Sequence, residues 1–131
     1  MMSTLYNILL EGTLIGQTAL EHADVPMGVV FGKINFRDNT YGFHFFKEYC
    51  IKGGILFSEY AEDNFISTYD LPGLQVISSN DLIIKGLSTN IEGMDSDGFN
   101  VNIVGIGAAD YEVEFPNHVQ KHEASFNNTI E

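Results

Sequence analysis

Short apolar runs divided by turn residues recur along most of this chain, and this feature limits its fold more than any other. The runs Tyr6–Glu11 and Thr13–Leu20 are separated by Gly12, which indicates a β-hairpin. Met27–Phe36 alternates apolar with small or polar residues, as expected for a third strand. Four further runs with turn residues between them are strand candidates: Leu74–Ser78, Leu82–Lys85, Phe99–Ile106 and Tyr111–Phe115.

One segment, from about Thr40 to Lys52, has a helical period instead. Aromatic residues recur there every four positions, at Tyr41, Phe45 and Tyr49, which predicts an amphipathic helix. Capping residues flank it: Asp38, Asn39 or Thr40 before it, and Gly53 and Gly54 after it. Antiparallel strands with one such helix predict an α+β domain, in which the helix packs on one face of a mainly antiparallel sheet.

The length fits a single domain. The chain has 131 residues, of which 44% are hydrophobic, so it can bury a core of ordinary size. No linker or internal repeat divides it, and we expect residues 1–131 to form one β-rich domain. A last helical turn is expected at His118–Ala124, with a frayed tail from about residue 127.

The charge is strongly negative and unevenly placed. Six Lys and Arg stand against eighteen Asp and Glu, a formal net charge of −12, which disfavours nucleic acid and anionic membranes as ligands. Between Gly53 and Gln120 the only basic residue is Lys85, against eleven acidic ones. The second half therefore suits a cationic partner.

The amino-terminal residues and the single cysteine favour the cytoplasm. The first twenty residues contain no Lys or Arg and no long apolar run, unlike a secretory signal or a membrane span. Cys50 has no partner for an internal disulfide and follows an aromatic run, so we expect a buried, unreactive thiol.

Motifs that carry metal or cofactor chemistry are incomplete. His118 and His122 are spaced like half of a zinc site, and Asp95–Gly98 begins like a calcium loop but continues with Phe99 at the next ligand position. Gly105-Ile106-Gly107 lacks the third glycine of a dinucleotide loop. We therefore predict exposed histidines, two turns, no metal and no cofactor.

Two other segments have both a structural and a functional interpretation. On a strand, Glu112 and Glu114 would share the polar face, which can also serve as an acidic docking surface. In the segment from Leu20 to Gly32, Gly28 and Gly32 would allow a neighbouring element to approach closely. His22 and Asp24 are the candidates there if a pocket opens.

In overall character the chain resembles bacterial immunity proteins, the cytosolic inhibitors of polymorphic or contact-dependent toxins. The similarity lies in small size, acidic surface, predicted β-rich α+β fold and lack of a catalytic signature, with no shared motif. It implies a one-to-one complex in which clustered carboxylates meet the Lys and Arg of a basic toxin, such as a nuclease.

These observations predict a cytoplasmic, non-enzymatic inhibitor that binds a cationic protein, possibly a toxin domain. The predicted contact residues are carboxylates with aromatic anchors: Glu59, Glu62, Asp63, Asp95, Asp97, Glu112 and Glu114, with Tyr60, Tyr69 and Phe99. Two alternatives remain open. The acidic surface can serve solubility alone, or scattered carboxylates and histidines can form a small-ligand or enzyme site.

Overall fold

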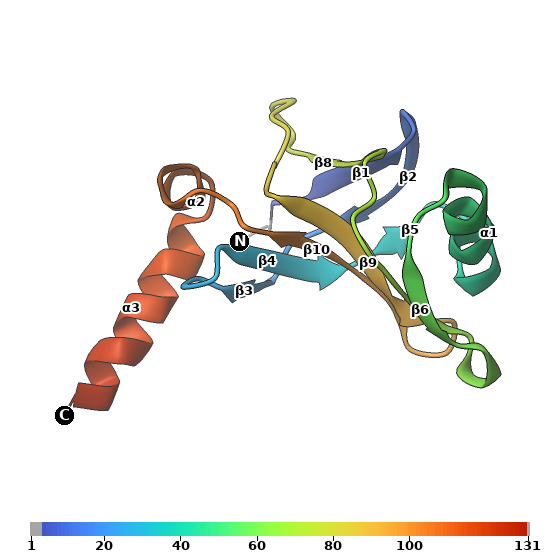
Figure 1. The fold of residues 1–131 in the computed structure, drawn as a ribbon. Coiled ribbons are helices and arrows are strands. Elements are labelled where there is room, and N and C mark those ends of the chain that lie inside the picture. The colour runs from blue at the N-terminus through green and yellow to red at the C-terminus, as the bar shows by residue number, and fades with distance from the viewer. Residues whose placement is uncertain (1–3, 131) are drawn as a thin grey trace.

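The computed structural model describes residues 4–130, and their side chains up to residue 125. The fold is α+β, with two antiparallel sheets and three α-helices (Figure 1). The helices lie at the two ends of the sheets, α1 at one end and α2 with α3 at the other (Figure 1). The predicted fold class is therefore confirmed, whereas the prediction of a single helix is wrong.

The first sheet has four strands in the order β5-β2-β1-β8. Its strands are β1 Tyr6–Leu10, β2 Thr13–Thr18, β5 Asn35–Phe36 and β8 Leu74–Ile77. The β1–β2 pair confirms the predicted hairpin. Glu11 and Gly12 form its turn with φ of 51° and 79°, as a two-residue hairpin turn requires.

The second sheet has six strands in the order β3-β4-β10-β9-β7-β6. Its strands are β3 His22–Asp24, β4 Val29–Lys33, β6 Phe57–Tyr60, β7 Phe65–Thr68, β9 Ser88–Met94 and β10 Gly98–Val104. Four of them, β3, β6, β7 and β9, were not predicted. Their sequences carry few apolar residues, and β6 is mostly exposed at the sheet edge.

The chain crosses between the sheets at Ile34, so the predicted strand Met27–Phe36 is in fact two strands. The N–H of Ile34 still bonds to the carbonyl of Phe99 in β10, whereas Asn35 and Phe36 pair with β2. Close approach occurs as predicted at Gly28 and Gly32. A Cβ on Gly32 would lie 2.8 Å from the nitrogen of Leu20, and one on Gly28 would lie 2.6 Å from the oxygen of Ile106.

Side chains from both sheets share one hydrophobic core. Residues with no exposed surface come from each sheet, among them Ile8, Val30, Ile66, Ile91 and Val101. Alternation along β10 explains this arrangement, because Phe99, Val101 and Ile103 all point into the core.

Helix α1, Phe43–Gly53, confirms the predicted helix but starts three residues later. Phe46 is fully buried and lies 5.8 Å from the rings of Phe36 and Phe99. The helix ends at Gly54, whose φ of 65° matches the predicted glycine stop. None of the predicted start caps is used, because the helix starts later and its N-cap is Gly42. Asp38 instead accepts a hydrogen bond from the N–H of Thr40.

The predicted strand Tyr111–Phe115 is wrong, since Ala108–Glu114 forms helix α2. Tyr111 and Phe115 are both buried, and their rings lie 5.4 Å apart. Apolar residues at positions 111, 113 and 115 have the two-residue spacing of a strand. Positions 111 and 115 also have the four-residue spacing of a helix, and in the helix Val113 lies on the solvent side with 80% of its surface exposed.

Two further predictions need correction. Helix α3, Pro116–Ile130, is much longer than the single turn predicted at His118–Ala124. The frayed tail predicted from about residue 127 falls on residues whose side chains lie outside the described part. Leu82–Lys85 forms one isolated bridge, Ile77 with Ile83, rather than a strand. Within the described residues, no helix is long and apolar enough to cross a membrane.

Candidate functional site

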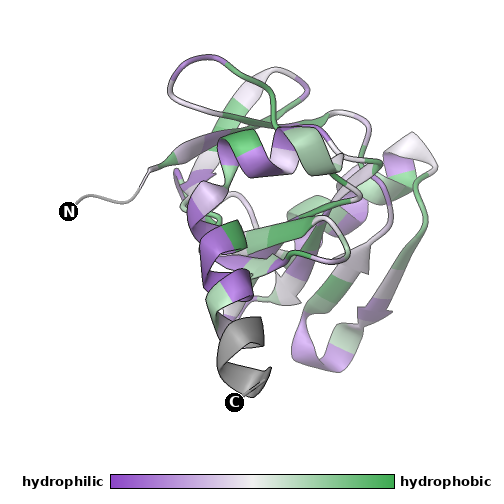
Figure 2. Cartoon of the chain, turned by 90° about the vertical axis from the view of Figure 1, so that its left-hand side faces the viewer, coloured by the Kyte–Doolittle hydropathy of each residue, from purple (hydrophilic) through white to green (hydrophobic). Residues whose placement is uncertain are grey.

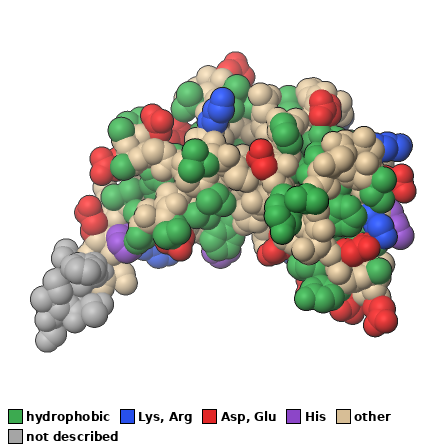
Figure 3. Space-filling model, viewed as in Figure 1, with side chains coloured by type: hydrophobic (Ala, Val, Ile, Leu, Met, Phe, Trp, Pro, Cys, Tyr) green, Lys and Arg blue, Asp and Glu red, His purple; other side chains and the backbone are tan. Residues whose placement is uncertain are grey.

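Carboxylates from two segments distant in the sequence meet at one end of the six-stranded sheet. Glu62 and Asp63 lie in the short 3-10 helix between β6 and β7, and Asp95 and Asp97 lie in the β9–β10 turn. The segments adjoin because β7 pairs with β9 and the N–H of Asp95 bonds to the carbonyl of Asn64 over 3.3 Å. We call these four residues the acidic tip, at the lower right of Figures 1 and 3.

Asp95 has a structural role within the tip. Its Oδ1 accepts a hydrogen bond of 2.9 Å from the backbone N–H of Phe43, the first residue of α1. Gly42 at the N-cap has no side chain to do this, so the cap comes from the β9–β10 turn. Asp95 therefore serves the fold as well as the charge of this surface.

Three tip carboxylates face solvent without partners. Glu62, Asp63 and Asp97 are exposed, and no described side chain forms an ion pair or hydrogen bond with them. Nearby cations neutralise only part of the negative charge of this surface. Lys47 pairs with Glu59 over 3.0 Å, and the side chain of Lys33 lies against Gly98. Glu59 is therefore a partly neutralised neighbour of the tip.

The three predicted aromatic anchors differ in position. Tyr60 directly precedes the 3-10 helix of the tip and is 69% exposed. Tyr69 is also exposed but follows β7 at the opposite end of the β6–β7 hairpin. Phe99 is only 3% exposed and packs against Phe36 and Phe46, so its prediction as a contact residue is wrong. A core-facing position in β10 explains this error.

Glu112 and Glu114 lie far from the tip and do not share one face. Both belong to α2, where residues two apart point in different directions. Glu114 is half-buried and accepts a hydrogen bond of 3.1 Å from the hydroxyl of Tyr6. Burial, with the charge and hydrogen bond of Glu114, raises the pKa of Tyr6 well above its ordinary value. The predicted acidic strand face is therefore absent from this helix.

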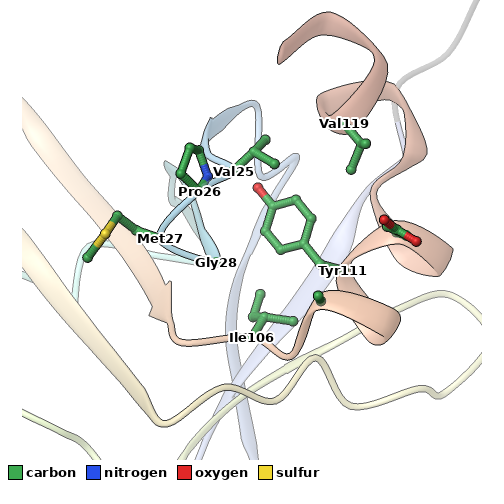
Figure 4. Close-up of a pocket in the computed structure, with 9 residues that line it drawn as sticks. Val25, Pro26, Met27, Gly28, Ile106, Tyr111 and Val119 are labelled. Carbon is green, nitrogen blue, oxygen red and sulfur yellow. The ribbon is translucent and has the colours of Figure 1, made fainter. Parts of the chain in front are cut away.

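A cavity of about 300 Å³ does open at the segment Leu20–Gly32 (Figure 4). Val25, Pro26 and Gly28 line it from one side, and Tyr111 and Val119 from α2 and α3. The hydroxyl of Tyr111 donates to the carbonyl of Val29 over 2.9 Å, and burial, then the charge of Asp24, raises its pKa. This lining is largely apolar.

The predicted pocket residues His22 and Asp24 do not line that cavity. His22 stacks on Phe31 instead, with ring centres 5.0 Å apart. A second cavity of about 240 Å³ does bring a histidine near carboxylates, with His118, Glu21 and Glu114 among its lining residues. His118 is half-buried there and bonds through Nε2 to the carbonyl of Leu20 over 2.8 Å, which corrects the prediction of an exposed ring.

No group of three or more His, Cys, Asp or Glu side chains suited to a metal ion exists among the described residues. Asp95–Gly98 is the turn of the β9–β10 hairpin. Cys50 is fully buried, as predicted, and burial raises the pKa of its thiol.

Comparisons with known proteins return no match. No family model, no curated protein and no solved structure is significantly similar to the chain. Function must therefore be argued from the geometry of the surface.

The β6 strand supplies one feature of that surface that sequence reasoning missed. It is the outer strand of the six-stranded sheet, and β7 is its only partner among the described strands. In an antiparallel pair, every second residue of a strand bonds to the partner strand. The hydrogen bond from the N–H of Tyr69 to the carbonyl of Leu56 shows which residues do so here, and it leaves the backbone N–H and C=O groups of Phe57 and Glu59 pointing away from β7. An exposed strand edge thus ends at the acidic tip, beside Tyr60.

Proposed function

We propose that this protein is a protein-binding inhibitor that holds a cationic partner at the acidic tip. The observation that carries this proposal is the meeting of Glu62 and Asp63 with Asp95 and Asp97 across the β7–β9 pair. Neutralisation of a basic toxin, as the resemblance to immunity proteins implies, is the form of inhibition that such a surface suits best.

Electrostatics supports a role in association. Exposed, unpaired carboxylates in one place attract positive charge over a distance of about one Debye length, ~8 Å at physiological salt. Such charges raise the rate of encounter more than the final affinity. The net charge of −12 adds a general attraction of the same sign.

Tyr60 and the β6 edge support a specific contact beside the charges. Exposed tyrosine side chains supply large contact area at low entropic cost and are frequent in interface hot spots. The outward backbone groups of Phe57 and Glu59 can pair with an extended segment of a partner. Charge then governs encounter, and Tyr60 with the strand edge holds the complex together.

A matched pair of charge-reversal variants tests this proposal. The partner is captured from the native host with the full chain and identified, and its association is measured by stopped flow over a range of NaCl concentrations. Asp63→Lys with Asp97→Lys should slow association at least about tenfold and flatten its salt dependence. Asp24→Lys with Glu123→Lys changes the same charge at exposed positions outside the tip and should have a much smaller effect.

The same experiment separates the proposal from its rivals. A captured partner without a basic surface, or equal effects of the two double variants, would contradict binding at the tip. For an inhibitor, adding the chain must also suppress the activity of the captured protein. If the acidic surface serves solubility alone, the charge-reversed chain should precipitate more readily, and no specific partner should be captured by the parent chain.

A small-ligand site is the second candidate, and the cavity lined by His118, Glu21 and Glu114 favours it. Its polar groups already have structural partners, since Tyr6 bonds to Glu114 and His118 bonds to Leu20. His118→Gln, which keeps a donor to that carbonyl, should leave partner inhibition intact if the tip carries the function.

A further inference from the structure

Four large apolar side chains are exposed together at the opposite end of the molecule from the acidic tip. Leu82 is 51% exposed, Ile83 45%, Leu87 87% and Val113 80%. We call these residues the α2 surface. Single exposed apolar residues are common, but contiguous groups of them on a soluble domain mark places where another molecule binds.

The four side chains are contiguous although they come from two segments. Ile83, Leu82 and Val113 line one cavity of about 210 Å³ between the 82–87 segment and α2. Ile83 also lines a neighbouring cavity of about 300 Å³ that contains Leu87. The side chain of Leu87 lies against Gly105, which directly precedes Ile106 in the wall of the first cavity.

Hydrogen bonds hold the 82–87 segment in this position. The N–H of Leu82 bonds to the side chain of Ser78, and the N–H of Ile84 bonds to the carbonyl of Val76 in β8. The N–H of Leu87 bonds to the carbonyl of Val104 at the end of β10 over 2.8 Å. Ile84 is buried, whereas its neighbours Leu82 and Ile83 remain exposed. The apolar surface is therefore fixed before any partner arrives.

Acidic side chains surround the α2 surface. Asp110 and Glu114 line the cavity that contains Val113, and Asp81 directly precedes Leu82. Lys85 is the one cation among the residues that line this cavity. Apolar and acidic side chains are interspersed at the upper left of Figure 3, and α2 carries both apolar and hydrophilic colouring in Figure 2.

This charge pattern determines which occupant is complementary. A second copy of the chain would bring its own carboxylates against those of α2, and the overall charge of −12 adds to the repulsion. A protein segment with apolar residues in the centre and Lys or Arg at its margins would pair with both the apolar surface and the surrounding carboxylates.

We propose that the α2 surface is a second protein-docking site, which binds an apolar-centred, Lys- or Arg-flanked segment of a partner protein. It is separate from the acidic tip. Strand β10 has seven residues and runs from the tip toward α2, a distance of about 20 Å at ~3.3 Å per residue. The proposal does not rest on the function assigned to the tip, so either can fail alone.

A synthetic amphipathic peptide of Leu and Lys, about five helical turns long, is the probe. Titration into isotopically labelled protein, followed by amide NMR, should shift the signals of Gly86, Gly105 and Val113 more than those of Asp63 and Asp97. Leu87→Ser with Val113→Ser should weaken peptide binding at least about tenfold, since it removes the two most exposed side chains of the site.

Controls address the fold, the site and the role of apolar contact. Ile51→Ser with Leu56→Ser changes two exposed apolar residues at the α1 end and should leave peptide binding unchanged. Thermal unfolding confirms that each double variant folds. A Leu/Glu peptide of the same pattern should not bind, and a Lys/Ser peptide should bind far more weakly.

Several outcomes would overturn this proposal. One is that the Leu/Glu or the Lys/Ser peptide binds as tightly as the Leu/Lys peptide. Another is that the Leu87→Ser/Val113→Ser variant binds the Leu/Lys peptide as tightly as the parent does. A third is that only the Asp63→Lys/Asp97→Lys variant loses peptide binding. Sedimentation that shows a dimer abolished by Leu87→Ser with Val113→Ser would assign the surface to a second copy instead.

Discussion

The carboxylate of Asp95 accepts a hydrogen bond of 2.9 Å from the backbone N–H of Phe43, which joins the β9–β10 turn to the first turn of α1. The two residues are 52 positions apart in the sequence. Asp95 thus contributes both to the acidic tip and to the position of the helix that covers this end of the core.

The double role of Asp95 predicts a loss of stability when its carboxylate is removed. Asp95→Ala should lower the free energy of unfolding by about 1–2 kcal/mol, because the N–H of Phe43 loses its acceptor. Asp95→Asn keeps an acceptor oxygen and should cost less. Urea denaturation measures both, and Asp97→Ala, which breaks no described hydrogen bond, should stay within about 0.5 kcal/mol of the parent.

Tyr49 predicts how stability depends on pH. Its hydroxyl donates to Oε1 of Glu11 over 2.5 Å, and burial, together with that bond and the charge of Glu11, raises the pKa of Tyr49 to about 12. A folded-state pKa above the unfolded value of 10.0 means that the protonated phenol favours folding. This contribution is complete below pH 10 and is lost as the pH rises through about 12.

The free energy of unfolding should therefore decline from pH 10 to 12, and the decline should be shallower in Tyr49→Phe. Denaturant titrations at several pH values, followed by circular dichroism, give the comparison. Tyr60→Phe, on an exposed ring, controls for the loss of one phenol. An identical pH profile in Tyr49→Phe and the parent would contradict the role of this tyrosine.

Phe99 and Tyr60 should have opposite effects on stability and binding. Phe99→Ala removes a buried ring that packs on Phe36 and Phe46, and should cost about 3–5 kcal/mol. Tyr60→Ala, at 69% exposure, should cost less than about 1 kcal/mol but weaken partner binding. Thermal unfolding and partner titration of both variants check this. A stable Phe99→Ala variant would show that the ring is not part of the core.

Two glycines allow a matched test of backbone packing. Gly32→Ala places a Cβ 2.8 Å from the nitrogen of Leu20, so strands must shift, at a cost of about 1–3 kcal/mol. In Gly53→Ala at the end of α1, the new Cβ meets only the flexible side chain of Ile55 at 3.2 Å. That variant should be near neutral, and chemical denaturation of both measures the difference. Equal stabilities would argue against close packing at Gly32.

Local sequence patterns correctly predicted the elements in which the spacing of apolar residues fits a strand or a helix but not both. The β1–β2 hairpin and helix α1 follow directly from alternation around Gly12 and from four-residue aromatic spacing. The segment Tyr111–Phe115 has apolar residues that satisfy both periods, so the pattern alone could not distinguish a strand from a helix. The exposure of Val113, and with it part of the α2 surface, depends on that distinction.

The sequence by itself determined the α+β class, the acidic surface and the buried thiol, because alternation, charge and composition are properties of neighbouring residues or of the whole chain. Only the tertiary structure decided which carboxylates meet. Pairing of β7 with β9 brings Asp63 beside Asp95, while α2 carries Glu112 to the other end. These relationships depend on hydrogen bonds between distant segments, whose partners no local pattern specifies.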